Sequence, residues 1–144
     1  MTTPTLQSLS DRLEIAELLA RYARGVDTGD WDLWRSVFTP DAQLDYTDVG
    51  FPVGSPAEIS AAFAAGFEHI PWAQHIITNI EIDLDGDTAS VRAMFLNPMQ
   101  LPGMDDMSMC GGHYLHEMVR TPDGWKSEHL IEKNVWFHNR PGAA

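Results

Sequence analysis

The sequence predicts a single α+β domain in which helices come first and long strands follow. Apolar residues recur at helical spacing in the first half of the chain, whereas the second half alternates in the manner of strands. Helices followed by strands favour a curved sheet that packs against the helices, because alternating βαβ units would interleave the two. With 144 residues, 44% of them apolar, the chain can enclose one core and one small cavity. We therefore expect one domain over residues 1–144.

The first predicted helix runs from Ser8 to Val26. Its apolar residues recur every three or four positions, which indicates one buried face. Ser8 with Asp11 three residues on resembles a capping box, and Gly29 can supply the left-handed cap at the other end.

Two shorter helices are predicted before the sheet. Asp30 can cap one over residues 31–38, which Thr39-Pro40 ends. Ser55-Pro56 opens the next, because a capping serine is followed by a proline in the first turn, and this helix runs to about Glu68. Between the two, Leu44 and Tyr46 share the buried face of a strand.

The second half of the chain is predicted to be an antiparallel meander. Asp85-Gly86 and Pro122-Asp123-Gly124 are turn sequences, and a loop containing Pro and Gly supplies the third connection. They separate β-rich runs near residues 73–83, 87–97, 107–121 and 125–138. In the third run His113 shares one face with Leu115 and Glu117, while His116 points the other way, toward surface or interface.

Composition excludes several classes of function. Twenty-one acidic residues against nine basic ones give a formal charge of −12, which would repel nucleic acid and anionic lipid. No stretch approaches the roughly 20 apolar residues that span a bilayer, and the start of the chain lacks the features of a signal peptide. We expect a soluble cytoplasmic protein with no nucleic-acid or membrane partner. The lone Cys110 cannot form an internal disulfide and is expected to be buried and inert.

Several short motifs together resemble one known family over nearly the whole chain. The chain is similar to the SnoaL-like branch of the nuclear-transport-factor-2-like superfamily, close to the scytalone dehydratase type. The motifs that carry the resemblance are the block Tyr22–Trp31, then Phe38–Ala42, Asp45-Tyr46, Gln74-His75-Ile76, Gly112-His113-Tyr114 and Gly124-Trp125-Lys126. The resemblance implies a cone in which three N-terminal helices pack on a strongly curved, mainly antiparallel sheet that encloses a pocket.

The resemblance also implies a catalytic site. Asp27 and His75 stand where related dehydratases and dehydrochlorinases have a catalytic dyad, in which the carboxylate orients the imidazole that removes a proton. Tyr22, Tyr46 and His113 match residues that polarise a carbonyl or protonate a departing hydroxyl. Neither a metal nor an organic cofactor is implied, and the substrate is expected to be small and hydrophobic.

The chain departs from this pattern at two positions. Dehydrochlorinases and bile-acid dehydratases have an arginine near the last strand, where His129 or Lys133 is the nearest candidate here. Scytalone dehydratase has a tyrosine just before its dyad aspartate, where this chain has Val26. The electrophilic partner of the dyad and the polarity of the substrate therefore stay open.

Other interpretations of the same residues also stay open. Asp27 alone would be explained as a cap at a helix end, and His75 as a hydrogen-bonded core histidine. The methionine-rich segment near residues 94–109 suits either a cavity wall or an oligomer interface. A dehydratase-like lyase acting on a polyketide-, aromatic- or steroid-like carbonyl compound is the favoured function. The alternatives are a cyclase or ketosteroid-isomerase-like proton shuttle and a non-catalytic binding protein. Dimers or trimers are expected from the resemblance.

Overall fold

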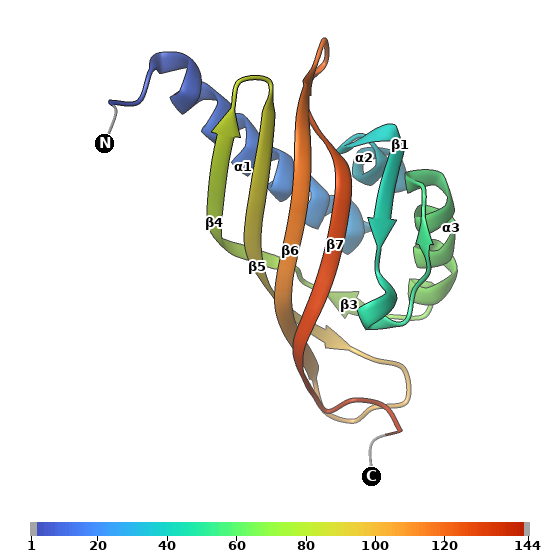
Figure 1. The fold of residues 1–144 in the computed structure, drawn as a ribbon. Helices are drawn as coiled ribbons and strands as arrows, with labels where there is room; N and C mark the ends of the chain where they lie inside the picture. Colours follow the sequence, from blue (N-terminus) through green and yellow to red (C-terminus); the bar gives the residue numbers. More distant parts are fainter. Residues whose placement is uncertain (1–2, 143–144) are drawn as a thin grey trace.

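Three helices pack on one strongly curved sheet in the computed structural model, which describes residues 3–142 (Figure 1). The helices are α1 (Leu6–Thr28), α2 (Trp31–Arg35) and α3 (Pro56–Phe67), with one 3-10 turn, η1 (Thr47–Val49). The strands are β1 (Phe38–Asp45), β2 (Val53–Gly54), β3 (Trp72–Ala73), β4 (Ile76–Asp85), β5 (Thr88–Gln100), β6 (Ser108–Thr121) and β7 (Gly124–His138). The predicted fold class, a cone of helices on a curved and mainly antiparallel sheet, is confirmed.

The sheet is a meander closed by one parallel pair. Strands β4 to β7 pair antiparallel in sequence order, and Gly86 and Gly124 adopt the positive φ angles, 59° and 96°, that their turns require. Strand β1 then pairs in parallel with β7 and antiparallel with β2. At the far side β3 pairs with the end of β5, beyond the point where β4 stops. The predicted order of strands is confirmed.

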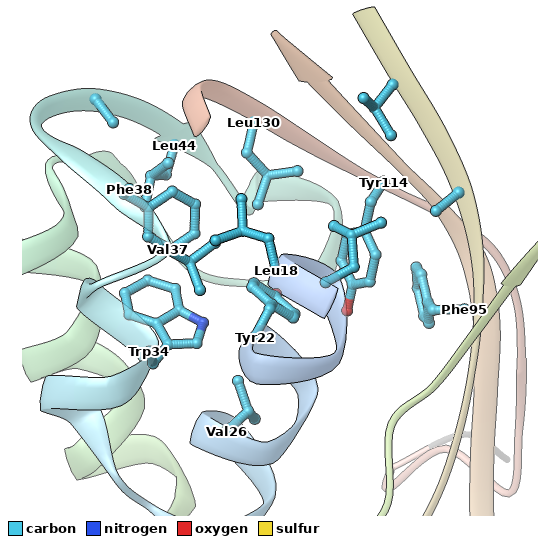
Figure 2. Close-up of a cluster of buried hydrophobic side chains, with 14 of the residues drawn as sticks. Leu18, Tyr22, Val26, Trp34, Val37, Phe38, Leu44, Phe95, Tyr114 and Leu130 are labelled. Carbon is cyan, nitrogen blue, oxygen red and sulfur yellow. The ribbon is translucent and has the colours of Figure 1, made fainter. Parts of the chain in front are cut away.

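The core lies between the helices and the inner face of the sheet. Figure 2 shows Tyr22 of α1 between Trp34 of α2 and Tyr114 of β6, and all three side chains are almost fully buried. Gly25 allows α1 and α2 to approach closely, since a Cβ atom there would lie 2.8 Å from the Cβ of Trp34. This packing fixes the last turn of α1, which carries Asp27.

The start of α1 differs from the prediction. The helix begins at Leu6, and the Thr5 hydroxyl caps it by accepting a hydrogen bond from the Ser8 amide. The predicted capping box of Ser8 and Asp11 is wrong, because Asp11 is buried and is held by another part of the chain. Its carboxylate accepts hydrogen bonds from the Arg120 guanidinium at 2.8 and 2.9 Å and from Trp125 Nε1 at 3.1 Å.

The two shorter helices confirm the predicted starts and correct one end. Asp30 caps α2 through the Leu33 amide, but the helix ends at Arg35 and Phe38 already belongs to β1. The chain turns into a strand early because the Ser127 amide of β7 donates to the Val37 carbonyl. Helix α3 begins after Ser55 with the predicted cap and proline, and ends at Phe67. Among residues 3–142, no helix is both long and apolar enough to cross a membrane.

Candidate active site

Asp27 and His75 form a hydrogen-bonded pair, as the resemblance implied. His75 Nδ1 lies 2.6 Å from Asp27 Oδ1, and the backbone amide of His75 donates to Oδ2 at 2.9 Å. Two contacts from one residue fix both the ring and the chain that carries it. With Nδ1–H donated to the carboxylate, the free nitrogen Nε2 is the one that can accept a proton.

Asp27 is not the helix cap that its sequence position alone would suggest. Asp27 lies in the last turn of α1, yet the helix is ended by Gly29, whose backbone amide reaches back to the carbonyls of Gly25 and Val26. The Asp27 carboxylate is thus free to hold His75. The His75 side chain is about 10% exposed and the Asp27 side chain about 20%. His75 sits between β3 and β4, where the Gln74 amide bonds the Pro98 carbonyl of β5.

The pair borders a cavity with two compartments. An outer vestibule of about 280 Å³ is lined by Trp31, Phe67, Trp72 and the Asp27–His75 pair. An inner chamber of about 180 Å³ lies deeper, and its walls are mostly apolar. The residues that line both compartments are Val26, Phe67, Ile70, His75, Asn97 and Met99. His75 therefore contributes to the walls of both compartments.

The structure separates the two predicted tyrosines. Tyr22 lines the inner chamber, and its hydroxyl lies 2.8 Å from that of Tyr46. Tyr46 is fully buried behind Tyr22 and lines neither compartment. Burial raises the pKa of both phenols, and that of Tyr114 beside them, well above the ordinary value. These tyrosines are neutral hydrogen-bonding groups, with Tyr22 in reach of the chamber and Tyr46 supporting it.

The expectation that His113 faces the cavity is wrong. The buried face of β6 carries Tyr114, His116 and Met118, so the alternation of the strand turns His113 to the outer face. There its Nε2 lies 3.3 Å from the Arg92 guanidinium. The two glycines before it do mark an irregularity, because the pairing of β6 with β7 shifts between Gly111 and Gly112.

His116 was expected at the surface, and that prediction is also wrong. Its side chain is buried beside Tyr22 and Tyr114, and Nδ1 lies 2.9 Å from the Ser127 hydroxyl. Burial lowers its pKa to about 3, so the ring stays neutral over the ordinary range of pH. It lines neither compartment of the cavity and belongs to the core.

Sequence reasoning missed Glu132, a buried carboxyl in the inner chamber. This residue of β7 is 8% exposed and lines the chamber with Tyr22 and His75. Burial, with a smaller contribution from the charge of Asp48, raises its pKa to about 8. No hydrogen bond or ion pair from residues 3–142 contributes to that shift. The chamber thus holds a carboxyl group that is mostly protonated near neutral pH.

A β-bulge explains why Glu132 faces inward while His129 and Lys133 do not. Strict alternation from buried Trp125 would turn both of those basic residues toward the helices. The pairing with β6 instead shifts by one residue at Glu128, so that the inward face continues with Leu130 and Glu132. Neither basic residue lines the vestibule or the chamber. Glu132, in place of His129 or Lys133, is therefore the ionisable residue that β7 contributes to the chamber wall.

Other polar groups of the chamber are few. Asn97 of β5 lines both compartments, and its buried side-chain oxygen has no hydrogen-bond partner among the described residues. Cys110 is buried as expected, but it also lines the chamber, and burial raises its pKa to about 11. Met99 belongs to the cavity wall, whereas Met94 is exposed. Within residues 3–142, no three His, Cys, Asp or Glu side chains are grouped as ligands for a metal ion.

Comparison with known proteins assigns the family. The SnoaL-like domain matches residues 7–131, and the chain belongs to that family. An uncharacterized protein of Mycobacterium tuberculosis is 36% identical over 129 residues, which cover 89% of this chain and 88% of that one. A protein of known structure from Kribbella flavida has a TM-score of 0.83 at 30% identity, over 92% of this chain and 95% of that one.

The fold is also shared with a dehydrochlorinase of known structure. The hexachlorocyclohexane dehydrochlorinase of Novosphingobium barchaimii LL02 has a TM-score of 0.81 over 96% of this chain and 95% of its own. At 20% identity this likeness shows the fold alone. The resemblance stated from the sequence is confirmed at the level of family and fold.

Proposed function

We propose that this protein is a lyase in which His75 removes a proton next to a carbonyl group and the substrate then loses water. The observation that carries the proposal is the Asp27–His75 pair at the junction of the two compartments, with a 2.6 Å contact that leaves one imidazole nitrogen free. A base must reach its proton within hydrogen-bond distance, and a cavity wall is where it can.

The proposed reaction needs no acid or base besides the dyad, because His75 takes one proton and returns it. Nε2 of His75 takes the proton from carbon, and the C–H electron pair moves toward the carbonyl as an enolate. When the enolate collapses, a C=C bond forms and the C–O bond to the β-hydroxyl breaks. The imidazolium delivers its proton to that hydroxyl, so water leaves and His75 returns to its neutral state. Asp27 stabilises the imidazolium throughout without itself taking the proton.

The cavity favours a hydrophobic ring-bearing substrate. Trp31 and Trp72 line the vestibule, and Trp72 is 46% exposed there. Aromatic walls of this kind suit flat apolar molecules. The two compartments together fall in the range of about 300–1,000 Å³ in which proteins hold small organic ligands. The elimination catalysed by the Novosphingobium dehydrochlorinase supports the same class of reaction for this fold.

Turnover of a panel of β-hydroxy ketones and hydroxysteroid-like thioesters tests the proposal. We expect formation of the conjugated product with loss of one water, and a decrease of about 10²–10⁴-fold in kcat for His75→Ala. Asp27→Asn should also lower kcat, because the amide no longer balances the imidazolium charge. His113→Ala is the matched control, since that histidine lies on the outer face and its removal should leave kcat unchanged.

The other outcomes identify the alternatives. Conversion without water loss that still depends on His75 would assign a cyclase or an isomerase-like proton shuttle. Equal turnover by the parent and His75→Ala would exclude the dyad as the catalytic base. Tight binding of panel compounds without any conversion would show a binding protein in place of an enzyme.

A further inference from the structure

The inner chamber contains a carboxyl group for which residues 3–142 supply no hydrogen-bond or ion-pair partner. Glu132 is more than nine-tenths buried and borders the inner chamber, and Asp48, which contributes to its raised pKa, is committed to the Asn134 amide at 3.2 Å. A buried polar group without a partner costs free energy, and proteins ordinarily satisfy it. Its position in a cavity wall indicates that the missing partner is a bound molecule.

The charges of the groups around Glu132 favour its protonated form as the one that meets a ligand. Tyr22, Tyr46 and Tyr114 approach it from α1, the end of β1 and β6, and all three are neutral. Cys110 of β6 is also neutral, and Asp48 of η1 carries the nearest negative charge. Within residues 3–142 no cation is among the causes that set the charge of Glu132, so ionisation in the chamber is disfavoured.

We propose that the Glu132 carboxyl donates a hydrogen bond to the carbonyl oxygen of an uncharged substrate, and that it thereby selects neutral carbonyl compounds over anionic ones. A neutral acid can donate to an oxygen that gains negative charge as His75 removes the proton, so the same contact strengthens in the enolate. Glu132 thus takes the electrophilic role that an arginine would otherwise fill.

The selectivity follows from the charge of the chamber. A carboxylate ligand would bring a negative charge next to Glu132, and no Lys or Arg among the described residues lines the chamber to balance it, which is costly in an apolar cavity. A ketone of the same shape adds no charge and supplies the acceptor that the carboxyl needs. This inference rests on the proposed function in taking the cavity as the substrate site, but its test requires binding and no turnover.

Binding of 2-acetylnaphthalene, with 2-naphthoate as its anionic counterpart of matched shape, tests the proposal. We expect the full-length parent to bind the ketone at least about tenfold more tightly than the anion near pH 7. The fluorescence of Trp31 and Trp72 in the vestibule provides the readout. For the ketone, we expect the affinity of the parent to fall about five- to tenfold from about pH 7 to about pH 9.5, as the carboxyl loses its proton.

Two variants test whether Glu132 is the cause of the ketone affinity and of its dependence on pH. Glu132→Gln keeps a donor of nearly the same shape and should bind the ketone with an affinity that does not change over this pH range. Glu132→Leu removes the donor and should weaken ketone binding about five- to tenfold at every pH. Both variants replace an unsatisfied buried acid and should fold at least as well as the parent. His75 and Asp27 are present in all three proteins, so any effect of the dyad on binding is common to them.

Three results would overturn the inference. They are failure of the parent to bind the ketone near pH 7, equal ketone affinity for Glu132→Leu and Glu132→Gln, and preference for the naphthoate. Each is distinct from failure of the proposed function, which appears as absence of water loss or as turnover that survives His75→Ala. A parent that binds the ketone through Glu132 but converts no substrate would retain the selectivity and lose the lyase assignment.

Discussion

Two buried carboxyl groups, Asp11 and Glu132, have opposite environments in the same small domain. Asp11 lies where α1 meets the turn between β6 and β7, and it accepts hydrogen bonds from Arg120, Trp125 and Gln7. Those contacts hold its pKa well below the ordinary value. Glu132 borders the cavity with no such partner, and burial raises its pKa to about 8. The domain thus keeps one buried acid ionised and the other protonated.

The comparison distinguishes a buried acid that stabilises the fold from a buried acid that is available to bind a ligand. At the Asp11 end, Arg120 donates hydrogen bonds to Asp11 and Asp87, and its guanidinium lies 4.8 Å from the centre of the Trp125 ring. At the Glu132 end, the carboxyl and the Asn97 oxygen lack such partners among the described residues. Of the two buried acids, the satisfied one lies where the helix meets the sheet, and the unsatisfied one lies in the wall of a cavity that a molecule can enter.

Removal of the satisfied acid should have the larger effect on stability. We expect Asp11→Ala to lower the free energy of unfolding by about 3 kcal/mol, because it leaves Arg120 and the Trp125 indole without their buried acceptor. Denaturation in urea measures the change. The matched control is Asp87→Ala, which removes the exposed partner of the same arginine and should cost less than about 1 kcal/mol. If the two substitutions lowered the free energy of unfolding equally, the buried Asp11 contact would contribute no more to stability than the exposed one.

Replacement of Glu132, the acid without a partner, should instead raise the free energy of unfolding. The pKa of Glu132 is raised from 4.5 to about 8, so the folded state keeps a proton that the unfolded state releases in this range. Its contribution to stability is complete below about pH 4.5 and is lost as pH rises toward about 8. Glu132→Gln should therefore be more stable than the parent by about 1–3 kcal/mol near pH 8.

Urea denaturation at several pH values tests the sign of this effect. The difference between Glu132→Gln and the parent should grow from about pH 5 to about pH 8 and then level off. Glu128→Gln, an exposed residue of the same strand, should leave the profile of the parent unchanged. A parent that gains stability relative to Glu132→Gln as pH rises would show that the carboxyl is ionised and stabilised by a partner.

The order of helices and strands could be predicted from the sequence because it depends on local patterns. Turn residues such as Gly86 and Gly124, and the Ser55-Pro56 helix start, act within a few positions, and the structure follows them. The Ser8–Asp11 box failed for the reason that distinguishes local from distant contacts. The Asp11 carboxylate accepts a hydrogen bond from Arg120, which is more than one hundred residues away in the sequence. No local sequence pattern predicts a contact over that separation.

The site could be predicted only in part. The errors concern residues on β6 and β7, where the prediction depends on which face of the strand points toward the helices. The motifs of the family predicted that Asp27 and His75 pair, and the structure has their side chains in hydrogen-bond contact. His113 and Glu132 depend instead on which face of a strand turns inward. On β6 the large buried residues Tyr114 and Met118 were the available signal against His113. On β7 the bulge at Glu128 reverses the alternation, and no signal in the sequence marks it.

The smallest effect that we predict concerns His116, a buried base that lies behind the chamber and does not take part in it. Burial lowers its pKa from 6.5 to about 3, so the unfolded chain binds a proton between these values that the folded chain does not. Stability is therefore lost as pH falls below about 6.5, by about 1 kcal/mol from pH 6.5 to about pH 5.5. His116→Gln should remove this part of the acid dependence and leave ketone binding unchanged. If His116→Gln instead weakened ketone binding as much as Glu132→Leu, the core behind Tyr22 would have to be counted as part of the site.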